Sequence, residues 1–196
     1  MARPRVHTDA LRDELLGVSL AMVEDSGITA LAVREVAARA GTSTTAVYSL
    51  FGSKVGLQRA VILRGCGDFA DVQAAAEVTD DPARDIAELG LVYVQWALDH
   101  PRLYEVIFGQ AVVGLEPTPE IEAAAARAMA PLADAVGRAI GAGQFRTAPV
   151  EVVAASLWAQ VHGIASLLLA GRLDPGLDLA SAAAAVIDGW RTGTLS

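Results

Sequence analysis

Apolar residues recur along the chain at spacings of three and four, and alternating runs of β-branched and polar residues are missing. This is the period of helices that bury one face, whereas half-buried strands have a period of two. The first segment with this period is expected to be capped by Thr8 and to stop at Gly27. Its apolar face consists of Leu11, Leu15, Val18 and Met22. The pattern predicts an all-α fold.

Glycine and proline divide the rest of the chain into further helices. Two short helices are expected at about 32–40 and 42–51, followed by a longer one that starts near Lys54 and runs toward Glu77. Pro82 follows a polar cluster and suits the first turn of the next helix. The later helices are expected at about 83–99, 102–108, 120–142, 150–170 and 179–190.

Residues 33–51 have the pattern of two short helices joined by a tight turn. Gly41 lies in the turn, where a positive φ is accessible mainly to glycine. Ala37 is small where the first helix must let the second approach. The apolar contact between the helices is expected from Val36, Ala40, Val47, Leu50 and Phe51. This spacing favours a DNA-reading helix-turn-helix, with an ordinary helical hairpin as the alternative.

The second of these helices has a polar exposed face. Its members have short hydrogen-bonding groups and one aromatic hydroxyl, which suit base edges and phosphates in a major groove: Ser43, Thr44, Thr45, Tyr48 and Ser49. Ser43 or Thr44 is also expected to cap this helix, whose N-terminal amides can then meet a phosphate.

The charges are distributed unevenly along the chain. The formal net charge is −8, yet residues 1–65 contain eight Lys/Arg against six Asp/Glu, so the excess of acidic residues falls in 66–196. A DNA-facing end and an acidic body would have this asymmetry. The positive excess of the N-terminal part is only modest.

The run from Gly27 to Leu57 resembles the DNA-binding module of the TetR family. The matching positions are Arg34, Glu35, Ala37, Ala40, Gly41, Ser43, Tyr48, Phe51, Lys54 and Leu57, with Val36 and Val47 as conservative replacements. The resemblance implies that Tyr48 and Lys54 hold phosphates and that Arg34 meets the backbone or a base at the groove edge. It also implies that three residues face bases: Thr44, Thr45 and Ser49.

Four positions depart from the family pattern. Ala32 stands where the family usually has a phosphate-binding threonine, and Thr42 replaces an apolar residue in the turn. Thr45 replaces a common glycine, and Leu50 a common histidine. These departures affect base preference rather than the fold. The arm Arg3-Pro4-Arg5 is expected either to reach DNA or to be a solvated tail.

Similarity to the family extends more weakly into the C-terminal part. Residues 100–108 resemble a short kinked helix of the family, and residues 157–173 resemble a Trp-x-x-x-His-Gly segment of one subgroup, with Trp158, His162 and Gly163 in those places. The resemblance implies a three-helix DNA-binding domain at 1–65, and a helical ligand-binding and dimerisation domain at 66–196.

The last two expected helices, 150–170 and 179–190, are apolar on more than one face. A helix of this kind is normally buried on several faces. We expect these helices to form a four-helix interface between two subunits, as in the family, with an intramolecular core as the alternative. A homodimer also suits an operator with two half-sites.

The resemblance further implies a pocket for a small effector. Few buried charges are expected there, which favours an apolar or aromatic effector whose binding shifts the dimer away from the operator. The residues expected either to line this pocket or to belong to an ordinary core are Tyr93, Trp96, Tyr104, Phe108, Met129, Trp158 and His162.

Other classes of function have little support in the sequence. The three histidines are scattered and no phosphate loop or hydrolase motif occurs, so we expect no enzyme, no cofactor and no metal site. Cys66 is the only cysteine, which fits the cytoplasm, and no uninterrupted apolar run of membrane-spanning length occurs. The expected function is transcriptional regulation through binding to double-stranded operator DNA, and the resemblance implies repression, the family's usual mode. The alternative is a helical ligand-binding or scaffold protein with a vestigial DNA-binding end.

Overall fold

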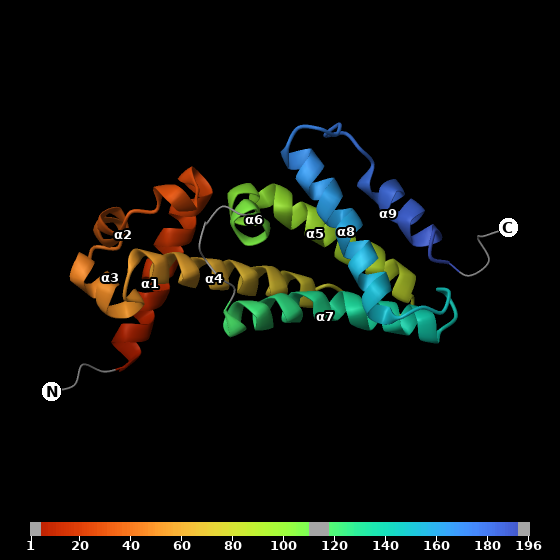
Figure 1. Cartoon of the computed structure of the whole chain (residues 1–196), viewed down its shortest axis with the longest axis horizontal. Helices are drawn as coiled ribbons and strands as arrows, with labels where there is room; N and C mark the ends of the chain where they lie inside the picture. The colour runs from red at the N-terminus through yellow and green to blue at the C-terminus, as the bar shows by residue number, and fades with distance from the viewer. Residues whose placement is uncertain (1–4, 110–117, 192–196) are drawn as a thin grey trace. The chain divides into compact units, whose positions relative to one another are not determined.

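The computed structural model of the chain describes residues 5–109 and 118–191 (Figure 1). Within these ranges the elements are helices, which confirms the predicted all-α class. In chain order they are α1 (Arg5–Ser26), the short 3-10 helix η1 (Ile28–Ala30), α2 (Val33–Arg39), α3 (Thr44–Phe51), α4 (Lys54–Ala74), α5 (Pro82–Asp99), α6 (Pro101–Phe108), α7 (Pro119–Gly141), α8 (Val150–Leu169) and α9 (Leu179–Asp188).

The prediction of Thr8 as a helix cap is wrong. Helix α1 already begins at Arg5, so Thr8 lies inside its first turn. Nothing between Arg5 and Thr8 breaks a helix, and a capping residue is needed only where a helix begins. The 3-10 helix η1 was not predicted either, because three residues are too short for a periodic pattern. The arm residues Arg3 and Pro4 lie outside the described residues.

The chain forms two compact units, which we call the N-terminal unit and the C-terminal unit. The N-terminal unit contains Met1–Asp68 and His100–Ala124, and the C-terminal unit contains Phe69–Asp99 and Ala125–Ser196. The boundaries therefore fall inside α4, between α5 and α6, and inside α7. Helix α6 packs against α1 as part of the N-terminal unit.

The core of the N-terminal unit joins α1, α2 and α3. Leu15, Val36 and Val47 are almost completely buried in it, and Phe51 closes it at the end of α3. Side chains of this size each contribute roughly 1.5–3 kcal/mol when fully buried. Helices as short as α2 and α3 are unstable alone, so this shared core holds them.

In the C-terminal unit α8 and α9 both pack against α5 (Figure 1). Val136, Phe145 and Val153 are central to the core of this unit. Helix α8 nevertheless leaves apolar side chains in solvent, with Val152 52% and Leu167 45% exposed. By length and composition α8 could cross a membrane. Its most apolar 18-residue stretch has a mean hydropathy of 1.7, and 22% of that stretch is buried within the protein.

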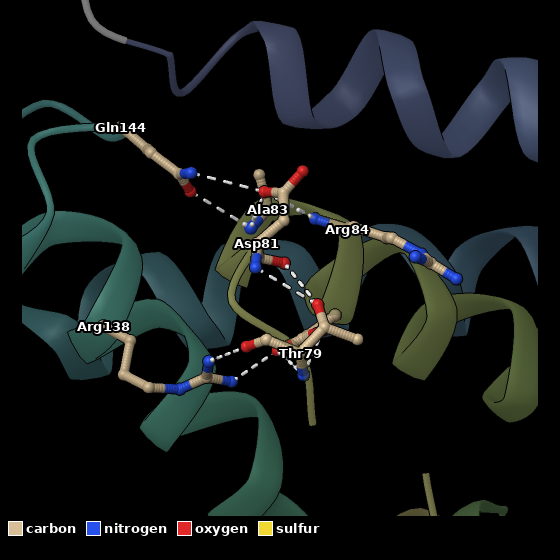
Figure 2. A network of polar contacts seen from close by, with 7 residues as sticks. Thr79, Asp81, Ala83, Arg84, Arg138 and Gln144 are labelled. Carbon is tan, nitrogen blue, oxygen red and sulfur yellow. Dashed lines mark hydrogen bonds and ion pairs between the residues drawn. The ribbon is translucent and has the colours of Figure 1, made fainter. Parts of the chain in front are cut away.

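A polar network ties the connection between α4 and α5 to α7 (Figure 2). The carboxylate of Asp85, which is 4% exposed, accepts hydrogen bonds from the backbone N–H and hydroxyl of Thr79 and forms an ion pair with Arg138 at 2.6 Å. Arg138 also donates to the carbonyl oxygen of Thr79 at 3.0 Å. Beside it, Asp81 accepts from the backbone N–H of Ala83 at the start of α5.

Burial raises the pKa of Asp85, but the hydrogen bonds from Thr79 and Arg138 outweigh it and hold the pKa below its usual value. A carboxylate of lowered pKa stabilises the fold at every pH above its unfolded pKa of about 3.9. That contribution is lost as the pH falls through the lower, folded pKa. The ion pair should therefore stabilise the C-terminal unit at neutral pH and cease to do so in strong acid.

Asp85→Asn is expected to lower the free energy of unfolding at pH 7 by about 2 kcal/mol, because it leaves Arg138 without its buried partner. The variant should also lose part of the acid dependence of stability below about pH 4. Denaturant unfolding followed by circular dichroism at pH 7 and pH 3 measures both effects. The neighbouring exposed Asp80→Asn is the control. A variant as stable as the control at pH 7 would contradict the assignment.

Candidate functional site

Helices α2 and α3 are joined by a turn that reverses the chain in four residues, 40–43. Gly41 has φ of 61°, the left-handed conformation expected for it. The side chain of Ser43 accepts a hydrogen bond from the backbone N–H of Ala46 at 3.2 Å, so Ser43 is the N-cap of α3. The expected helix-turn-helix is therefore present, with Ser43 rather than Thr44 as its cap.

The apolar residues expected between the two helices form that contact. Val36, Val47 and Phe51 are buried, and Ala40 and Leu50 are partly buried against the same core. This packing turns the opposite face of α3 to solvent, where Thr45, Tyr48 and Ser49 are exposed. Tyr48 has 49% of its surface exposed, so its ring and hydroxyl are accessible to a bound molecule.

Two further predicted residues lie at helix starts. Arg34 is exposed in the first turn of α2, and Thr44 is half-buried as the first residue of α3. The start of α2 has no side-chain cap, because Ala32 occupies the N-cap position with extended backbone angles. Ala32 therefore has no polar side-chain group that could cap α2 or bind a phosphate.

Lys54 is the first residue of α4, and its ammonium group is exposed. It donates to the carbonyl oxygen of Thr29 at 3.5 Å, a long contact that an anion could replace. Ser53 accepts a hydrogen bond from the backbone N–H of Gly56 at 3.0 Å and so caps α4. The amide groups at this helix start carry a partial positive charge beside the lysine.

The structure also assigns roles that the sequence analysis missed. Arg12, counted there only as a positive charge, donates to the carbonyl oxygen of Leu50 at 3.1 Å and stacks over the ring of Phe51 at 4.8 Å. Arg39 forms an ion pair with Glu35 at 2.6 Å. Arg12 thereby joins α1 to the end of α3, and Arg39 links successive turns of α2. The spacing of four between Glu35 and Arg39 was the available signal for the second contact.

Tyr104 and Phe108 lie on α6 in the N-terminal unit, with ring centroids 4.9 Å apart. The other residues expected at a ligand pocket lie in the C-terminal unit. There a cavity is lined by side chains from the end of α4 and from α5, α7, α8 and α9. Its empty space is about 740 Å³, part of which is open to solvent.

Tyr93, Met129 and Trp158 line this cavity. His162 lies beside it, where its Nδ1 is 3.0 Å from the Tyr93 hydroxyl and its ring contacts that of Trp158. Trp96 instead packs against Phe69, with ring centroids 4.9 Å apart. The structure therefore brings together four of the expected residues at the cavity and places the fifth in the adjacent aromatic core.

Gly56 is the further residue on which the geometry of the N-terminal unit depends. A Cβ atom there would overlap the carbonyl oxygen of Phe51, so only glycine lets α4 start this close to the end of α3. The sequence analysis did not single it out. Glycine inside a helix is normally unfavourable, which was the available signal.

Gly56→Ala is expected to lower the free energy of unfolding by roughly 1–3 kcal/mol, because the first turn of α4 must move away from α3. Gly17→Ala is the matched control, because Gly17 lies in α1 with open space around its would-be Cβ, and it should be neutral or stabilising. Thermal and denaturant unfolding measure both. Equal stability of the two variants would contradict the close approach.

The chain was compared with families of known proteins. A model described as bacterial regulatory proteins, tetR family, matches residues 15–61, and a model described as tetracyclin repressor-like, C-terminal domain, matches residues 86–189. The helix-turn-helix falls inside the first match. The helices around the cavity from α5 onward fall largely inside the second.

Curated relatives include the HTH-type transcriptional regulators Rv1816 of Mycobacterium tuberculosis and Mb1846 of Mycobacterium bovis. Each is 26% identical over 126 residues, which is 62% of this chain and 54% of the relative. The matched segment thus spans about half the length of these relatives.

Solved structures with a similar fold cover nearly the whole chain. A protein of unknown function from Rhodococcus sp. RHA1 has a TM-score of 0.83 at 25% identity, covering 93% of this chain and 96% of that one. The putative regulatory protein SCO4313 has a TM-score of 0.73 at 27% identity, covering 96% and 98%. A TetR family transcription regulator from Marinobacter aquaeolei VT8 shares the fold, with a TM-score of 0.71. It is 21% identical, and the match covers 96% of this chain and 99% of that one.

The C-terminal family model alone covers more than half of the chain, and the N-terminal one covers the helix-turn-helix. Both models describe one family, whose members are DNA-binding transcriptional regulators rather than enzymes. The chain belongs to the TetR family of transcriptional regulators.

Proposed function

We propose that the chain binds double-stranded operator DNA with α3 as the helix that enters the major groove. The observation that carries this proposal is the polar face of α3, exposed while its apolar face is held in the core with α1 and α2. In this arrangement Thr44, Thr45 and Ser49 face base edges. The short hydroxyl groups of serine and threonine can donate or accept a hydrogen bond at a base edge. The methyl group of threonine can also pack against the methyl group of thymine.

The remaining predicted residues act on the phosphate backbone. Tyr48 and Lys54 hold phosphates on either side of the groove, and Lys54 exchanges its long contact with Thr29 for a phosphate oxygen. Arg34 meets the backbone or a base at the groove edge. Ser43 caps α3, which directs the N-terminal amides of that helix toward a phosphate.

We propose that the protein acts as a homodimer through α8 and α9. The exposed residues on α8 include Val152, Ala159 and Leu167, which share one side of the helix by their spacing. Ala184 and Ala185 are exposed on α9. Small and apolar side chains of this kind let helices approach closely, so a second copy can cover the face. This assignment also accounts for the apolar character of α8 without a membrane, and the regulator then works in the cytoplasm.

We assign DNA binding to residues 1–65 and effector binding with dimerisation to residues 66–196. The cavity of the C-terminal unit supports a small, largely apolar effector, with Tyr93, Met129, Trp158 and His162 at or beside it. Trp96, Tyr104 and Phe108 were predicted with them and remain candidates for contact with the effector. The effector acts by favouring a dimer whose reading helices no longer match half-sites about 34 Å apart, which releases a repressor.

A vestigial DNA-binding end is the second candidate. It is favoured by Ala32, which leaves α2 uncapped, and by the engagement of Arg12 and Arg39 in contacts within the unit. Binding that is specific and falls steeply with salt separates a working operator binder from this alternative.

For DNA binding, selection of fragments from the source genome at roughly physiological salt should enrich a short inverted repeat. Lys54→Ala and Tyr48→Phe should weaken binding to all sequences, and Lys54→Ala should reduce the slope of log affinity against log salt by about 0.9. Thr44→Ala should change the preferred sequence, by about 1–3 kcal/mol at the base it faces. Fluorescence anisotropy measures all three.

The exposed Arg172→Ala, in the C-terminal unit, is the control and should leave the salt slope unchanged. A folded dimer that enriches no sequence, after any co-purified ligand has been removed, would favour the vestigial alternative. Equal losses on operator and random DNA for Thr44→Ala would remove it from the base-reading residues.

The dimer is tested by placing a charge on α8. Leu167→Glu is expected to shift the protein from dimer to monomer, because the interface would have to bury an unpaired carboxylate. Val78→Glu, at a site 74% exposed outside α8 and α9, is the matched control and should remain dimeric. Sedimentation equilibrium measures both. A dimeric Leu167→Glu variant would show that the interface lies elsewhere.

A further inference from the structure

One buried polar group at the cavity of the C-terminal unit has no partner. Gln73 lies near the end of α4, lines the cavity and is 5% exposed. Its side-chain nitrogen Nε2 is fully buried, and no hydrogen-bond acceptor reaches it among the described residues. An unpaired buried donor destabilises a fold, so its presence calls for an acceptor that arrives from outside the chain.

Two other polar groups at the cavity already have partners. The hydroxyl of Tyr93 is 3.0 Å from Nδ1 of His162. The side-chain nitrogen of Gln160 donates to the carbonyl oxygen of Ser156, on its own helix, at 3.3 Å. Among the described residues that line the cavity, Gln73 is therefore the one with a fully buried side-chain donor that has no partner.

The remaining lining is uncharged. The described residues around the cavity include no Asp, Glu, Lys or Arg side chain, and they are mostly aliphatic and aromatic. An ionised ligand would lose its hydration there without gaining a counter-charge, which is strongly unfavourable. A neutral ligand with a large apolar part would bury that part against the lining.

We propose that Gln73 determines effector specificity by donating a hydrogen bond from Nε2 to a neutral acceptor, such as a carbonyl oxygen, on an otherwise apolar molecule. This inference rests on the proposed function, in which the cavity holds the effector. It adds the chemical class of the effector and the residue that selects it. An apolar molecule without an acceptor would leave the amide unpaired and would bind less tightly for that reason.

The test compares ketones with hydrocarbons of the same shape, using the full-length dimer. Benzophenone and diphenylmethane form one pair, and acetophenone and ethylbenzene a smaller one. Isothermal titration is expected to show tighter binding of at least one ketone than of its hydrocarbon, by about tenfold for one buried hydrogen bond. The anion 4-benzoylbenzoate should bind more weakly than benzophenone.

Gln73→Leu, which keeps the size of the side chain and removes the amide, should abolish the preference for the ketone while hydrocarbon binding is retained. Gln160→Leu is the matched control, since its amide lines the same cavity but is already hydrogen-bonded, and it should keep the preference. Gln73→Leu should also unfold at the same or a higher temperature than the wild type, because it removes an unpaired buried donor.

Three results would overturn the inference. The first is that ketone and hydrocarbon bind equally in both pairs, or that neither binds. The second is a ketone preference that survives in Gln73→Leu, and the third is a clear loss of stability in that variant, which would mean that the fold itself satisfies the amide. Retention of a genome-selected DNA fragment is measured on the same preparations. If the proposed function is wrong, the protein will not retain the DNA fragment. If only the role of Gln73 is wrong, DNA binding will be intact while the ketone preference is missing or survives in Gln73→Leu.

Discussion

The exposed face of α3 depends on the apolar contact that holds α3 against α1 and α2. Helices of seven and eight residues, as α2 and α3 are, do not persist in water by themselves, because too few backbone hydrogen bonds offset the entropy of ordering them. Val36, Val47 and Phe51 bury their side chains in one core, and this fixes both the position of α3 and its rotation about its axis. The hydroxyl groups of Thr45 and Ser49 point away from the protein as a consequence of that packing.

Several contacts reinforce the same geometry from outside the core. Gly41 permits the turn, Ser43 caps α3, and Gly56 allows α4 to start against the carbonyl oxygen of Phe51. Arg12 completes the arrangement at the end of α3, where its positive charge meets the carbonyl oxygen of Leu50. A cation is favourable at this end of a helix. The family pattern of residues 27–57 is thus a set of requirements for placing one short helix.

The C-terminal unit solves a different problem, because its helices have more apolar surface than one subunit buries. Part of that surface surrounds the cavity, and part of it is exposed on α8. Against this apolar background polar groups are confined to a few positions. The Asp85–Arg138 pair joins the α4–α5 connection to α7, whereas the side-chain nitrogen of Gln73 is left without an acceptor at the cavity. The first arrangement stabilises the fold, and the second is the kind expected of a binding site.

The sequence by itself determined the helical class, most helix positions, the helix-turn-helix and the polar face of α3, because these are recorded in residue patterns over short stretches of the chain. Only the tertiary structure decided that α6 packs with the N-terminal unit, that Arg12 serves α3 and that Asp85 pairs with Arg138. The last two contacts join residues 38 and 53 positions apart, and no periodicity records such distances. The prediction of Thr8 as a cap failed for a related reason, since a polar residue near a chain end is compatible with lying before a helix or inside it. Gln73 has the same character, because no pattern in the sequence shows that its side-chain nitrogen is buried without an acceptor.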